Sequence, residues 1–529
     1  MSDERKRGRV LTSINPATLE IVGTAPDAPP EALPAALDAA RRAQREWTRT
    51  PLKRRRRLLA RLTKVLASDW EGVARVVSSE TGKPRLESLN SDVMAGLGVA
   101  DYCLWAILRL FKPKRLKGGR LAAALRLLGR SSFVHPRPVG VVGVIAPWNF
   151  PFGIPFTQAV MAVTAGNAVL LKPSSETPLT GLAIGELFAR AGFPEGLVQV
   201  LTGSGSGIGN ALVESPVDRL VFTGSVAVGR TVMAKAAQRL TPVTLELGGK
   251  DPLIVLDDAD LDRTVMGVTW ASFLNAGQVC VGVKRIYVHQ SLYDQFLEKF
   301  QRRVEALKLG WGWDDPSVSV GPLINEAALL KVEAAVERAK EQGARVLCGG
   351  RRAPGLKGYF FEPTVLVDVD QKMDCVREEI FSPVVVAFPF GEDEEAVRLA
   401  NDSRFALSAS VWTKDVDRGV ELAKKLTSGT VIVNNHAYTY GLGFAPWGGS
   451  GESGFGRTHG ELGFAELVEP HHVHVDRGKL PTDPWWSPCD AEKLSLNETL
   501  TRVAFGGQFR KIFGLWRQWR RLGRRSQSN

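Results

Sequence analysis

The feature that most constrains the fold is an alternation of β-rich apolar runs with helical patterns that begins at Val139. The apolar runs predict five strands, at residues 139–145, 168–171, 198–201, 219–222 and 253–256. The segments between them predict three helices, at residues 154–165, 179–191 and 228–239. Such alternation is typical of a parallel, doubly wound sheet that binds ligands beyond the carboxyl ends of its strands.

A second alternating series follows and predicts a second α/β domain. It comprises strands at residues 284–289 and 384–389 and helices at residues 292–307, 326–342 and 392–401. Because ligand sites favour domain boundaries, we expect an active site where the two series meet.

Composition indicates a soluble enzyme of several domains. The 529 residues exceed one ordinary core, and 44% are hydrophobic and 23% charged. The five cysteines are an odd number without Cys-x-x-Cys spacing, and the start at Met1 is polar, so we expect a cytoplasmic protein without a metal site. No apolar run of about 20 residues predicts a membrane-spanning helix.

Cys280 and Glu246 are the candidate nucleophile and base. They lie 34 positions apart in glycine-flanked segments. A thiolate can add to a carbonyl, and a nearby carboxylate can activate the water that cleaves the resulting thioester. Taken alone, the cysteine could be a buried apolar residue and the glutamate a solvated one.

A glycine-containing turn follows the strand predicted to end at Phe222. Thr223, Gly224 and Ser225 precede a helix that contains Gly229, which would let backbone amides and a helix N-terminus approach a pyrophosphate. This signal is weak on its own, and the four glycines between positions 203 and 209 lack the G-x-G-x-x-G spacing.

Seven segments taken together resemble the aldehyde dehydrogenase superfamily over about residues 10 to 475. In the family order they are Pro147-Trp-Asn-Phe-Pro151, Lys172-Pro-Ser174, Phe222-Thr-Gly-Ser225, Leu245-Glu-Leu-Gly-Gly-Lys250, Gly277-Gln-Val-Cys280, Glu378-Glu-Ile-Phe381, and Pro446-Trp-Gly-Gly449 with Ser453-Gly-Phe-Gly-Arg457. The resemblance implies oxidation of an aldehyde to a carboxylic acid with NAD or NADP. It also implies an α/β fold with a Rossmann-type cofactor domain, an α/β catalytic domain and a β-arm for oligomerisation.

The resemblance also implies roles for individual residues. Cys280 would be the nucleophile, Glu246 the base that activates water, and Asn149 a donor to the oxyanion together with the Cys280 backbone N–H. The residues expected to bind the cofactor are Trp148, Lys172, Ser175, Gly224, Ser225, Gly229, Glu379 and Phe381.

Simpler roles stay open for several of these residues. Asn149 could be a turn residue ahead of Pro151, Lys172 a solvated strand end, and Glu379 part of an exposed acidic pair. Many NAD-preferring relatives carry a carboxylate where this chain has Ser175, with Glu176 one residue later. Serine would not repel a 2′-phosphate, so either NADP is tolerated or Glu176 compensates and NAD is kept.

The expected substrate is an apolar aliphatic or aromatic aldehyde. Val279 and Val281 flank the nucleophile, phenylalanines follow Asn149, and no arginine adjoins Cys280. The alternatives are a semialdehyde dehydrogenase, a CoA-acylating enzyme, against which Glu246 argues, and a protein that keeps the fold without turnover.

In the family pattern, residues 10–130 and 140–246 form the cofactor-binding domain and residues 247–445 the catalytic domain. Residues 131–139 and 458–476 would be oligomerisation strands of a homodimer or homotetramer.

The net charge of +12 is concentrated in two basic segments. Residues 102–130 hold eight Lys or Arg and no acid, and residues 509–525 hold seven and none. Residues 492–525 have an amphipathic helical spacing that is interrupted at Gly506-Gly507, and residues 104–128 look similar. The extension at residues 484–529 also resembles that of a subset of the family.

The basic segments could contact an anionic membrane surface, which would make the protein peripheral on the inner face of a membrane. They could instead pack on the protein body, and no motif suggests nucleic acid.

Overall fold

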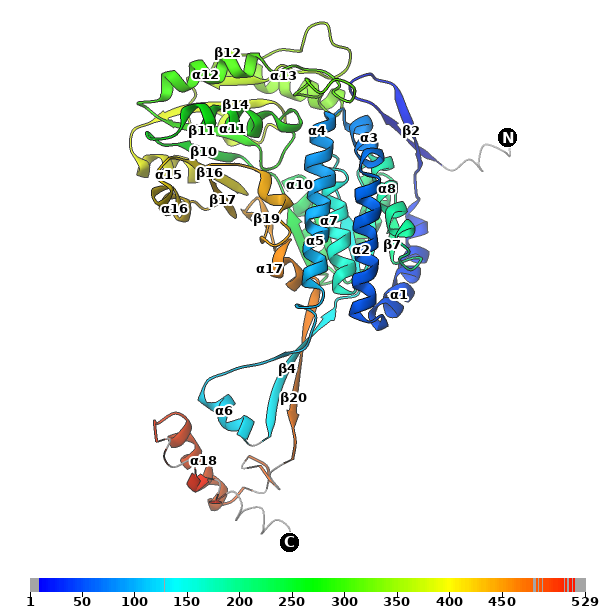
Figure 1. The fold of residues 1–529 in the computed structure, drawn as a ribbon, viewed down its shortest axis with the longest axis vertical. Coiled ribbons are helices and arrows are strands. Elements are labelled where there is room, and N and C mark those ends of the chain that lie inside the picture. Colours follow the sequence, from blue (N-terminus) through cyan, green and yellow to red (C-terminus); the bar gives the residue numbers. More distant parts are fainter. Residues whose placement is uncertain are drawn as a thin grey trace, which may run out of the picture. The chain divides into compact units, whose positions relative to one another are not determined.

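The computed structural model describes residues 9–127, 129–478, 482–483, 485–487, 489–508, 510, 513–515 and 517–518. These residues form two compact units (Figure 1). The first unit joins residues up to 109 with residues 138–468, and the second joins residues 110–137 with the chain from residue 469 onward. Residues 110–130, which were predicted to lie in the cofactor-binding domain, belong to the second of these units.

A six-stranded sheet forms one half of the first unit. Its strand order is β19 (Gly454–Phe455), β9 (Val243–Glu246), β8 (Arg219–Thr223), β5 (Val141–Ile145), β6 (Ala168–Lys172) and β7 (Val198–Val200). The strands run parallel except at the edge, where β19 pairs antiparallel with β9. Every residue of β6 is buried, as expected for a parallel sheet with both faces covered.

Helices from several parts of the chain pack on this sheet or on the helices that contact it. They are α1 (Leu33–Arg49), α2 (Leu52–Ser68), α3 (Trp70–Thr81), α5 (Ala95–Ala106), α7 (Gly153–Ala165), α8 (Pro178–Arg190), α9 (Asn210–Glu214) and α10 (Val226–Ala237). The helices α2, α5, α7 and α8 lie side by side in Figure 1 and contact one another. Each residue of α7 is buried, and the helix ends at Gly166, whose φ of 104° favours glycine.

A seven-stranded sheet forms the other half of the first unit. Its order is β12 (Arg345–Cys348), β13 (Thr364–Val367), β14 (Val384–Phe390), β11 (Val283–His289), β10 (Asp251–Val255), β16 (Ser408–Trp412) and β17 (Thr430–Val433). Only β12 is antiparallel to its neighbour. The main helices of this half are α11 (Leu261–Phe273), α12 (Tyr293–Glu305), α13 (Glu326–Glu341), α14 (Asp374–Arg377), α15 (Asp393–Asn401) and α16 (Val416–Lys425).

The predicted alternation of strands and helices is confirmed, with one difference in assignment. The run at residues 253–256 was grouped with the first series, but β10 pairs with β11 and β16 in the second sheet. The chain crosses between the sheets through Leu247, Gly248, Gly249 and Lys250, which join β9 to β10. Glu246 thus ends the last parallel strand of the first sheet.

Smaller elements complete the first unit. They are β1 (Val10–Ile14), β2 (Ile21–Pro26), β15 (Phe405–Ala406), β18 (Ser450–Gly451), α4 (Arg85–Glu87), α17 (Gly460–Ala465) and the short helices η2 (Pro30–Ala32), η3 (Ser88–Met94), η4 (Gly205–Gly209), η5 (Leu274–Gly277) and η6 (Tyr438–Gly441). The η3 segment is a π-helix, a form that is frequent at functional sites.

The second unit contains a three-stranded sheet in the order β20 (Val468–Asp476), β4 (Arg130–Pro138) and β3 (Lys114–Arg115). Ion pairs join Arg130 to Asp476 and Arg137 to Glu469, both at 2.6 Å, so β4 and β20 run antiparallel. The predicted strand at residues 458–476 is too long, because α17 occupies residues 460–465 and β20 begins only at Val468.

The basic segments only partly match their predicted helices. Residues 104–128 do not form one helix, because β3 and α6 (Arg120–Leu127) divide them. In the extension, α18 (Ala491–Ala504) ends just before the glycine pair at which an interruption was predicted. Pro484 and most of residues 509–529 lie outside the described residues, as does Leu128.

Candidate active site

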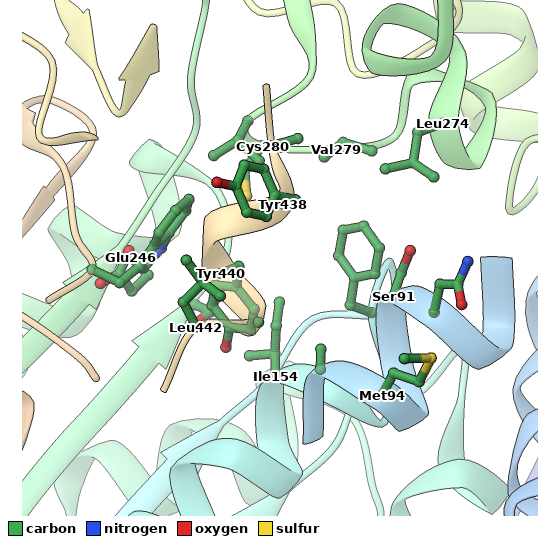
Figure 2. Close-up of a pocket in the computed structure, with 18 of the residues that line it drawn as sticks. Ser91, Met94, Ile154, Glu246, Leu274, Val279, Cys280, Tyr438, Tyr440 and Leu442 are labelled. Carbon is green, nitrogen blue, oxygen red and sulfur yellow. The ribbon is translucent and has the colours of Figure 1, made fainter. Parts of the chain in front are cut away.

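The candidate nucleophile and base line one cavity of about 410 Å³. Glu246 is the last residue of β9, and Cys280 lies in the turn that precedes β11. Figure 2 shows the Cys280 sulfur and Glu246 at one end of this cavity, opposite Ser91 and Met94 of η3. Glu246 and Cys280 thus come from strand ends in two different sheets and line the same cavity.

The turn before Cys280 has an unusual backbone. Asn275, Ala276 and Gly277 have φ values of 50°, 53° and 69°, and two of these three residues carry a Cβ that this region disfavours. A Cβ on Gly277 would lie 2.3 Å from the Ser382 carbonyl oxygen, so only glycine fits there. Such strain persists only where surrounding contacts fix the backbone.

The Gln278 side chain supplies some of those contacts. Its amide nitrogen donates to the Asn275 carbonyl at 3.0 Å, and its amide oxygen accepts from the Ile324 N–H at 2.9 Å. The conformation that presents Cys280 is thus held by hydrogen bonds to the segment that follows Pro322.

Asn149 is buried beside this turn. Its side-chain nitrogen donates to the Gln278 carbonyl at 3.0 Å, which leaves the second N–H of the same amide for another acceptor. Its own carbonyl accepts from Lys83 at 2.8 Å and from the Asn275 side chain at 3.0 Å. Hydrogen bonds therefore fix Asn149 through both its backbone carbonyl and its side-chain amide.

Lys83 belongs to a fully buried ion pair that supports Asn149. Its ammonium lies 2.7 Å from Asp92, and both side chains have no exposed surface. The other oxygen of Asp92 accepts from the backbone N–H groups of Phe152 and Gly153 at the start of α7. One carboxylate thus links the lysine to the helix that follows Asn149.

Glu246 is almost fully buried, and burial raises the pKa of its carboxyl group to about 8. Arg457, Thr458 and Trp447 act in the opposite direction but are outweighed by the loss of hydration. The Oε1 atom has no hydrogen-bond partner among the described residues. A carboxyl group with this pKa can exchange a proton near neutral pH.

Cys280 lies in a partly exposed position at the cavity wall. Burial of the sulfur and the nearby carboxylates of Asp251, Glu379 and Glu246 hold the pKa of its thiol above the usual range. The thiol is consequently protonated at neutral pH in the chain alone, and an attack on a carbonyl requires removal of that proton.

The cavity is predominantly apolar. Its lining comes from η3 and α7, from the Cys280 turn, from α11 and from the segment around η6; the residues are Asn90, Ser91, Met94, Ala95, Phe150, Ile154, Thr223, Glu246, Leu247, Trp270, Leu274, Val279, Cys280, Val281, Ala437, Tyr438, Tyr440, Gly441, Leu442 and Trp447. Glu246 is the one charged side chain among these described residues, so the lining offers no cation.

A second cavity of about 310 Å³ also reaches Cys280. Five predicted cofactor residues line it, namely Trp148, Gly224, Ser225, Glu379 and Phe381. Asn149, Thr223 and Leu247 line it as well. Cys280 thus contributes to the walls of both cavities.

The walls of the second cavity are built from aromatic, glycine and acidic residues. The rings of Trp148 and Phe381 meet edge to face with centroids 5.6 Å apart. Glu379 accepts from the Gly249 N–H at 3.1 Å, and a Cβ on Gly248 would lie 2.2 Å from its carboxylate. Burial raises the pKa of Glu379, against the influence of nearby Lys284 and Lys250.

The remaining predicted cofactor residues do not line this cavity. Lys172 is buried at the end of β6, where burial lowers the pKa of its ammonium to about 8 and Asp27 acts against that change. Ser175 lies three residues further along in the turn before α8. Gly229 lies inside α10, where a Cβ would meet the Leu247 side chain at 2.5 Å, so this glycine permits close packing.

Several residues that shape the site were not predicted from the sequence. Lys83 and Asp92 had no local signal, because nine positions separate them and their pairing depends on the tertiary fold. The positive φ values at residues 275–277 were not predicted, although asparagine and glycine are the residues that most readily adopt positive φ. Arg457 and Gln278 were quoted only as motif residues.

Two absences apply to the described part of the chain. No cluster of three or more His, Cys, Asp or Glu side chains could hold a metal ion there. None of the helices found in that part is long and apolar enough to cross a membrane.

Comparison with known proteins identifies the family. The aldehyde dehydrogenase family matches residues 3–473. The chain is 38% identical over 495 residues to a putative succinate-semialdehyde dehydrogenase [NADP(+)] 2 of Mycobacterium tuberculosis H37Rv, covering 93% of this chain and 92% of that protein. It is 37% identical to the succinate-semialdehyde dehydrogenase [NADP(+)] GabD of Escherichia coli K12, covering 89% of this chain and 95% of that protein.

Solved structures give the same result. An aldehyde dehydrogenase of Mycobacterium tuberculosis complexed with NAD+ matches with a TM-score of 0.84 and 37% identity, covering 89% of this chain and 96% of that one. The NAD+ complex of an aldehyde dehydrogenase from Bacillus cereus matches with a TM-score of 0.84 and 34% identity, over 89% and 94% of the two chains. The fold implied by the sequence motifs is confirmed, and the chain belongs to the aldehyde dehydrogenase family.

Proposed function

We propose that the protein oxidises apolar aldehydes to carboxylic acids through a thioester on Cys280. The observation that carries this proposal is that Cys280 and Glu246 share an apolar cavity while Cys280 also faces a second cavity. The aldehyde would enter the first cavity and the nicotinamide the second.

The residues of the second cavity fit a dinucleotide. The turn from Thr223 to Ser225 precedes the N-terminus of α10, where unpaired N–H groups and the helix dipole favour a pyrophosphate. Glu379 offers a carboxylate for ribose hydroxyls, and Trp148 and Phe381 offer flat apolar walls. When bound, NAD or NADP would accept the hydride from the aldehyde carbon.

The protein's own residues carry the remaining steps. Cys280 loses its proton, Glu246 being the nearby group that can take it, and the sulfur adds to the aldehyde carbon. The free N–H of Asn149 and the Cys280 backbone N–H would donate to the oxygen that becomes negative, which in other enzymes is worth about 3 kcal/mol per donor. Once Glu246 has passed the first proton to solvent and the thioester has formed, its carboxylate takes a proton from the water that releases the acid.

The cavity lining favours an apolar aldehyde over succinic semialdehyde. A substrate carboxylate in the first cavity would lose hydration, meet no cation and share the space with Glu246. Burying an unpaired charge in this way is costly. The relatives that carry the succinate-semialdehyde name therefore do not by themselves assign this substrate to the chain.

The test is a comparison of kcat/KM for hexanal, benzaldehyde and succinic semialdehyde, followed as NAD(P)H production. We expect at least a hundredfold preference for the two apolar aldehydes and no acceleration by CoA. A preference for succinic semialdehyde would contradict the apolar assignment, and dependence on CoA would favour acyl transfer to a thiol. The Cys280→Ala variant should have no activity with any aldehyde.

We propose that both NAD and NADP are accepted. Ser175 provides no negative charge to repel a 2′-phosphate, and the Glu176 carboxylate already accepts from the Asn325 side chain at 3.3 Å. The measurement is kcat/KM for both cofactors in the Ser175→Ala and Glu176→Ala variants. A strong NAD preference that survives the first substitution and vanishes in the second would show that Glu176 compensates.

The domain roles follow from the same assignment. We propose that the half with the six-stranded sheet binds the cofactor, and that residues 247–445 form the catalytic half. The strands β4 and β20 would pair with a second copy of the chain in a homo-oligomer. Light scattering of the purified protein, which should give a dimer or tetramer mass, tests this.

Membrane contact is a second proposal, and it concerns the second unit. Trp485, Trp486, Leu494, Phe505 and Phe513 are all more than half exposed there, and the Lys- and Arg-rich residues 509–525 include the last of them. Exposed aromatic side chains with basic residues suit an anionic lipid surface. In liposome flotation, the full chain should float with phosphatidylserine vesicles and a chain truncated at Trp485 should not; equal recovery in the aqueous layer would refute the proposal.

A further inference from the structure

The His436 imidazole is fully buried and hydrogen-bonded at both ring nitrogens. Its Nε2 lies 2.8 Å from the carbonyl oxygen of Val281, the residue that follows the candidate nucleophile. Its Nδ1 lies 2.8 Å from the Ser410 hydroxyl on β16. One side chain thus connects the Cys280 turn, the second sheet and the segment after β17.

The hydrogen-bond partners determine which nitrogen carries the proton. A carbonyl oxygen only accepts, so Nε2 must donate to Val281. The Trp412 indole donates to the Ser410 oxygen at 3.2 Å, and the hydroxyl proton of Ser410 is then free to point at Nδ1. The chain of donors therefore runs from Trp412 through Ser410 and His436 to Val281, with a neutral imidazole.

The charged groups around the ring agree with a neutral imidazole. Asp251 lies 3.9 Å from Nε2, and Lys284 and Arg285 of β11 act on that aspartate. Burial holds the pKa of the Asp251 carboxyl well above its ordinary value, and burial lowers the pKa of His436 to about 4. The His436 imidazole is therefore neutral at neutral pH.

The backbone on both sides of His436 is strained. Asn434 and Ala437 have φ values of 61° and 62°, a region that non-glycine residues seldom adopt. Ala437 and the following residues Tyr438 and Tyr440 line the apolar cavity. Because such strain persists only where neighbouring contacts fix it, the two hydrogen bonds of His436 are suited to hold this wall of the cavity.

Both turns therefore contribute to the cavity wall around Cys280, and His436 hydrogen-bonds from one to the other. The turn at residues 275–277 leads into Cys280, and the turn at residues 434–437 leads into the cavity wall. The Nε2 to Val281 hydrogen bond joins them through the residue after the nucleophile, whereas Gln278 acts two residues before it. Small displacements of reacting groups are costly, so a fixed distance between these turns matters for rate.

We propose that His436 is a positioning residue, which fixes the Cys280 turn against the wall of the aldehyde cavity by donating from Nε2 to the Val281 carbonyl. The proposal rests on the assignment of Cys280 as the nucleophile. It assigns no proton transfer to the imidazole, and it predicts that the essential feature is a donor at the Nε2 position.

Two substitutions separate this role from simple packing. In His436→Gln the amide nitrogen can reach the Nε2 position and donate to Val281, whereas in His436→Asn the shorter side chain can reach Ser410 but not Val281. Both variants remove the ring, so their thermal midpoints should fall by similar amounts. We expect kcat for hexanal to stay within about threefold of the parent in the Gln variant and to fall at least tenfold in the Asn variant.

Two further readouts locate the effect. The rate of Cys280 alkylation by iodoacetamide should change in the Asn variant and not in the Gln variant, and the KM for NAD(P) should stay unchanged in both. Equal losses of kcat in the two variants, or no loss in either, would overturn the proposal.

A third variant covers the case in which neither substitution folds. Ser410→Ala keeps the imidazole and removes only the donor to Nδ1, and because the Val281 carbonyl can only accept, Nε2 still donates to it. The kcat for hexanal should therefore stay within about threefold of the parent at unchanged cofactor KM, and a fall of tenfold or more would overturn the proposal. Activity that survives Cys280→Ala would instead refute the proposed function, which separates the two failures.

Discussion

The Glu246→Gln substitution should abolish turnover and stabilise the fold in the same molecule. Burial raises the pKa of Glu246 from 4.5 to about 8. In the unfolded chain this carboxyl group ionises near its ordinary pKa, so between pH 4.5 and 8 the folded state binds one more proton than the unfolded state. Stability from this group is therefore present below pH 4.5 and is lost as pH rises towards 8.

The size of the effect follows from about 1.4 kcal/mol per pKa unit. At pH 7 a folded carboxyl that is still protonated costs about 3 kcal/mol relative to an unfolded one that has ionised. A neutral glutamine has no such cost and fills nearly the same space. We therefore expect the thermal midpoint of Glu246→Gln to exceed that of the parent by several degrees at pH 8 and by almost nothing at pH 5.

Activity should show the same ionisation with the opposite consequence. Only the ionised carboxylate can accept a proton, so about a tenth of the parent enzyme is competent at pH 7 and about nine-tenths at pH 9. The rate of thioester hydrolysis in single-turnover experiments should accordingly rise about tenfold between these values. The parent enzyme is therefore expected to be more active but less stable at pH 9 than at pH 7.

The assays are differential scanning fluorimetry from pH 5 to 9 and rapid-quench measurement of the released carboxylic acid over the same range, because NAD(P)H forms before the thioester is hydrolysed. Using the difference between parent and variant removes the titration of other groups, because these are common to both proteins. A stability difference that does not depend on pH would refute the burial argument. A hydrolysis rate that is flat across pH 8 would refute the role of Glu246 as the base.

Three further outcomes test the supporting structure. Lys83→Met leaves the Asp92 carboxylate buried without its cation, and we expect the free energy of unfolding in urea to fall by about 3–5 kcal/mol. A smaller loss would mean that water reaches the carboxylate. Gly249→Ala places a Cβ 2.2 Å from the Cys280 carbonyl oxygen, so kcat should fall at least tenfold, and normal turnover would show that the turn can shift freely. In peptide mass mapping after brief treatment with iodoacetamide at pH 7, exposed Cys489 should be modified first and partly exposed Cys280 next, while buried Cys103, whose pKa burial raises to about 12, should stay unmodified.

Much of the fold could be predicted because it follows from local patterns. The strands around residues 141–145, 168–172 and 219–223 are continuous apolar runs, and parallel strands covered on both faces require such runs. The assignment of β10 to the first sheet was wrong for a related reason. An apolar run shows that a strand is buried but not which strands it pairs with, and the pairing of β10 with β11 and β16 depends on the crossing at residues 247–250.

The candidate site likewise contains residues that the sequence predicts and residues that it does not. Cys280, Glu246 and Asn149 could be named because each lies in a motif with a recognisable order, but the groups that fix them come from other parts of the chain. Lys83 reaches the Asn149 carbonyl across 66 positions.

His436 hydrogen-bonds to Val281 across 155 positions of the chain. No periodicity or spacing in the sequence predicts hydrogen bonds of this kind. Their partners are backbone carbonyls, which every residue possesses and which leave no mark in a sequence. Residues that react can thus be found from motifs, whereas residues that position them require the folded chain. For this reason we expect variation in rate among similar chains to arise from positions such as 83 and 436, where the reacting groups themselves are unchanged.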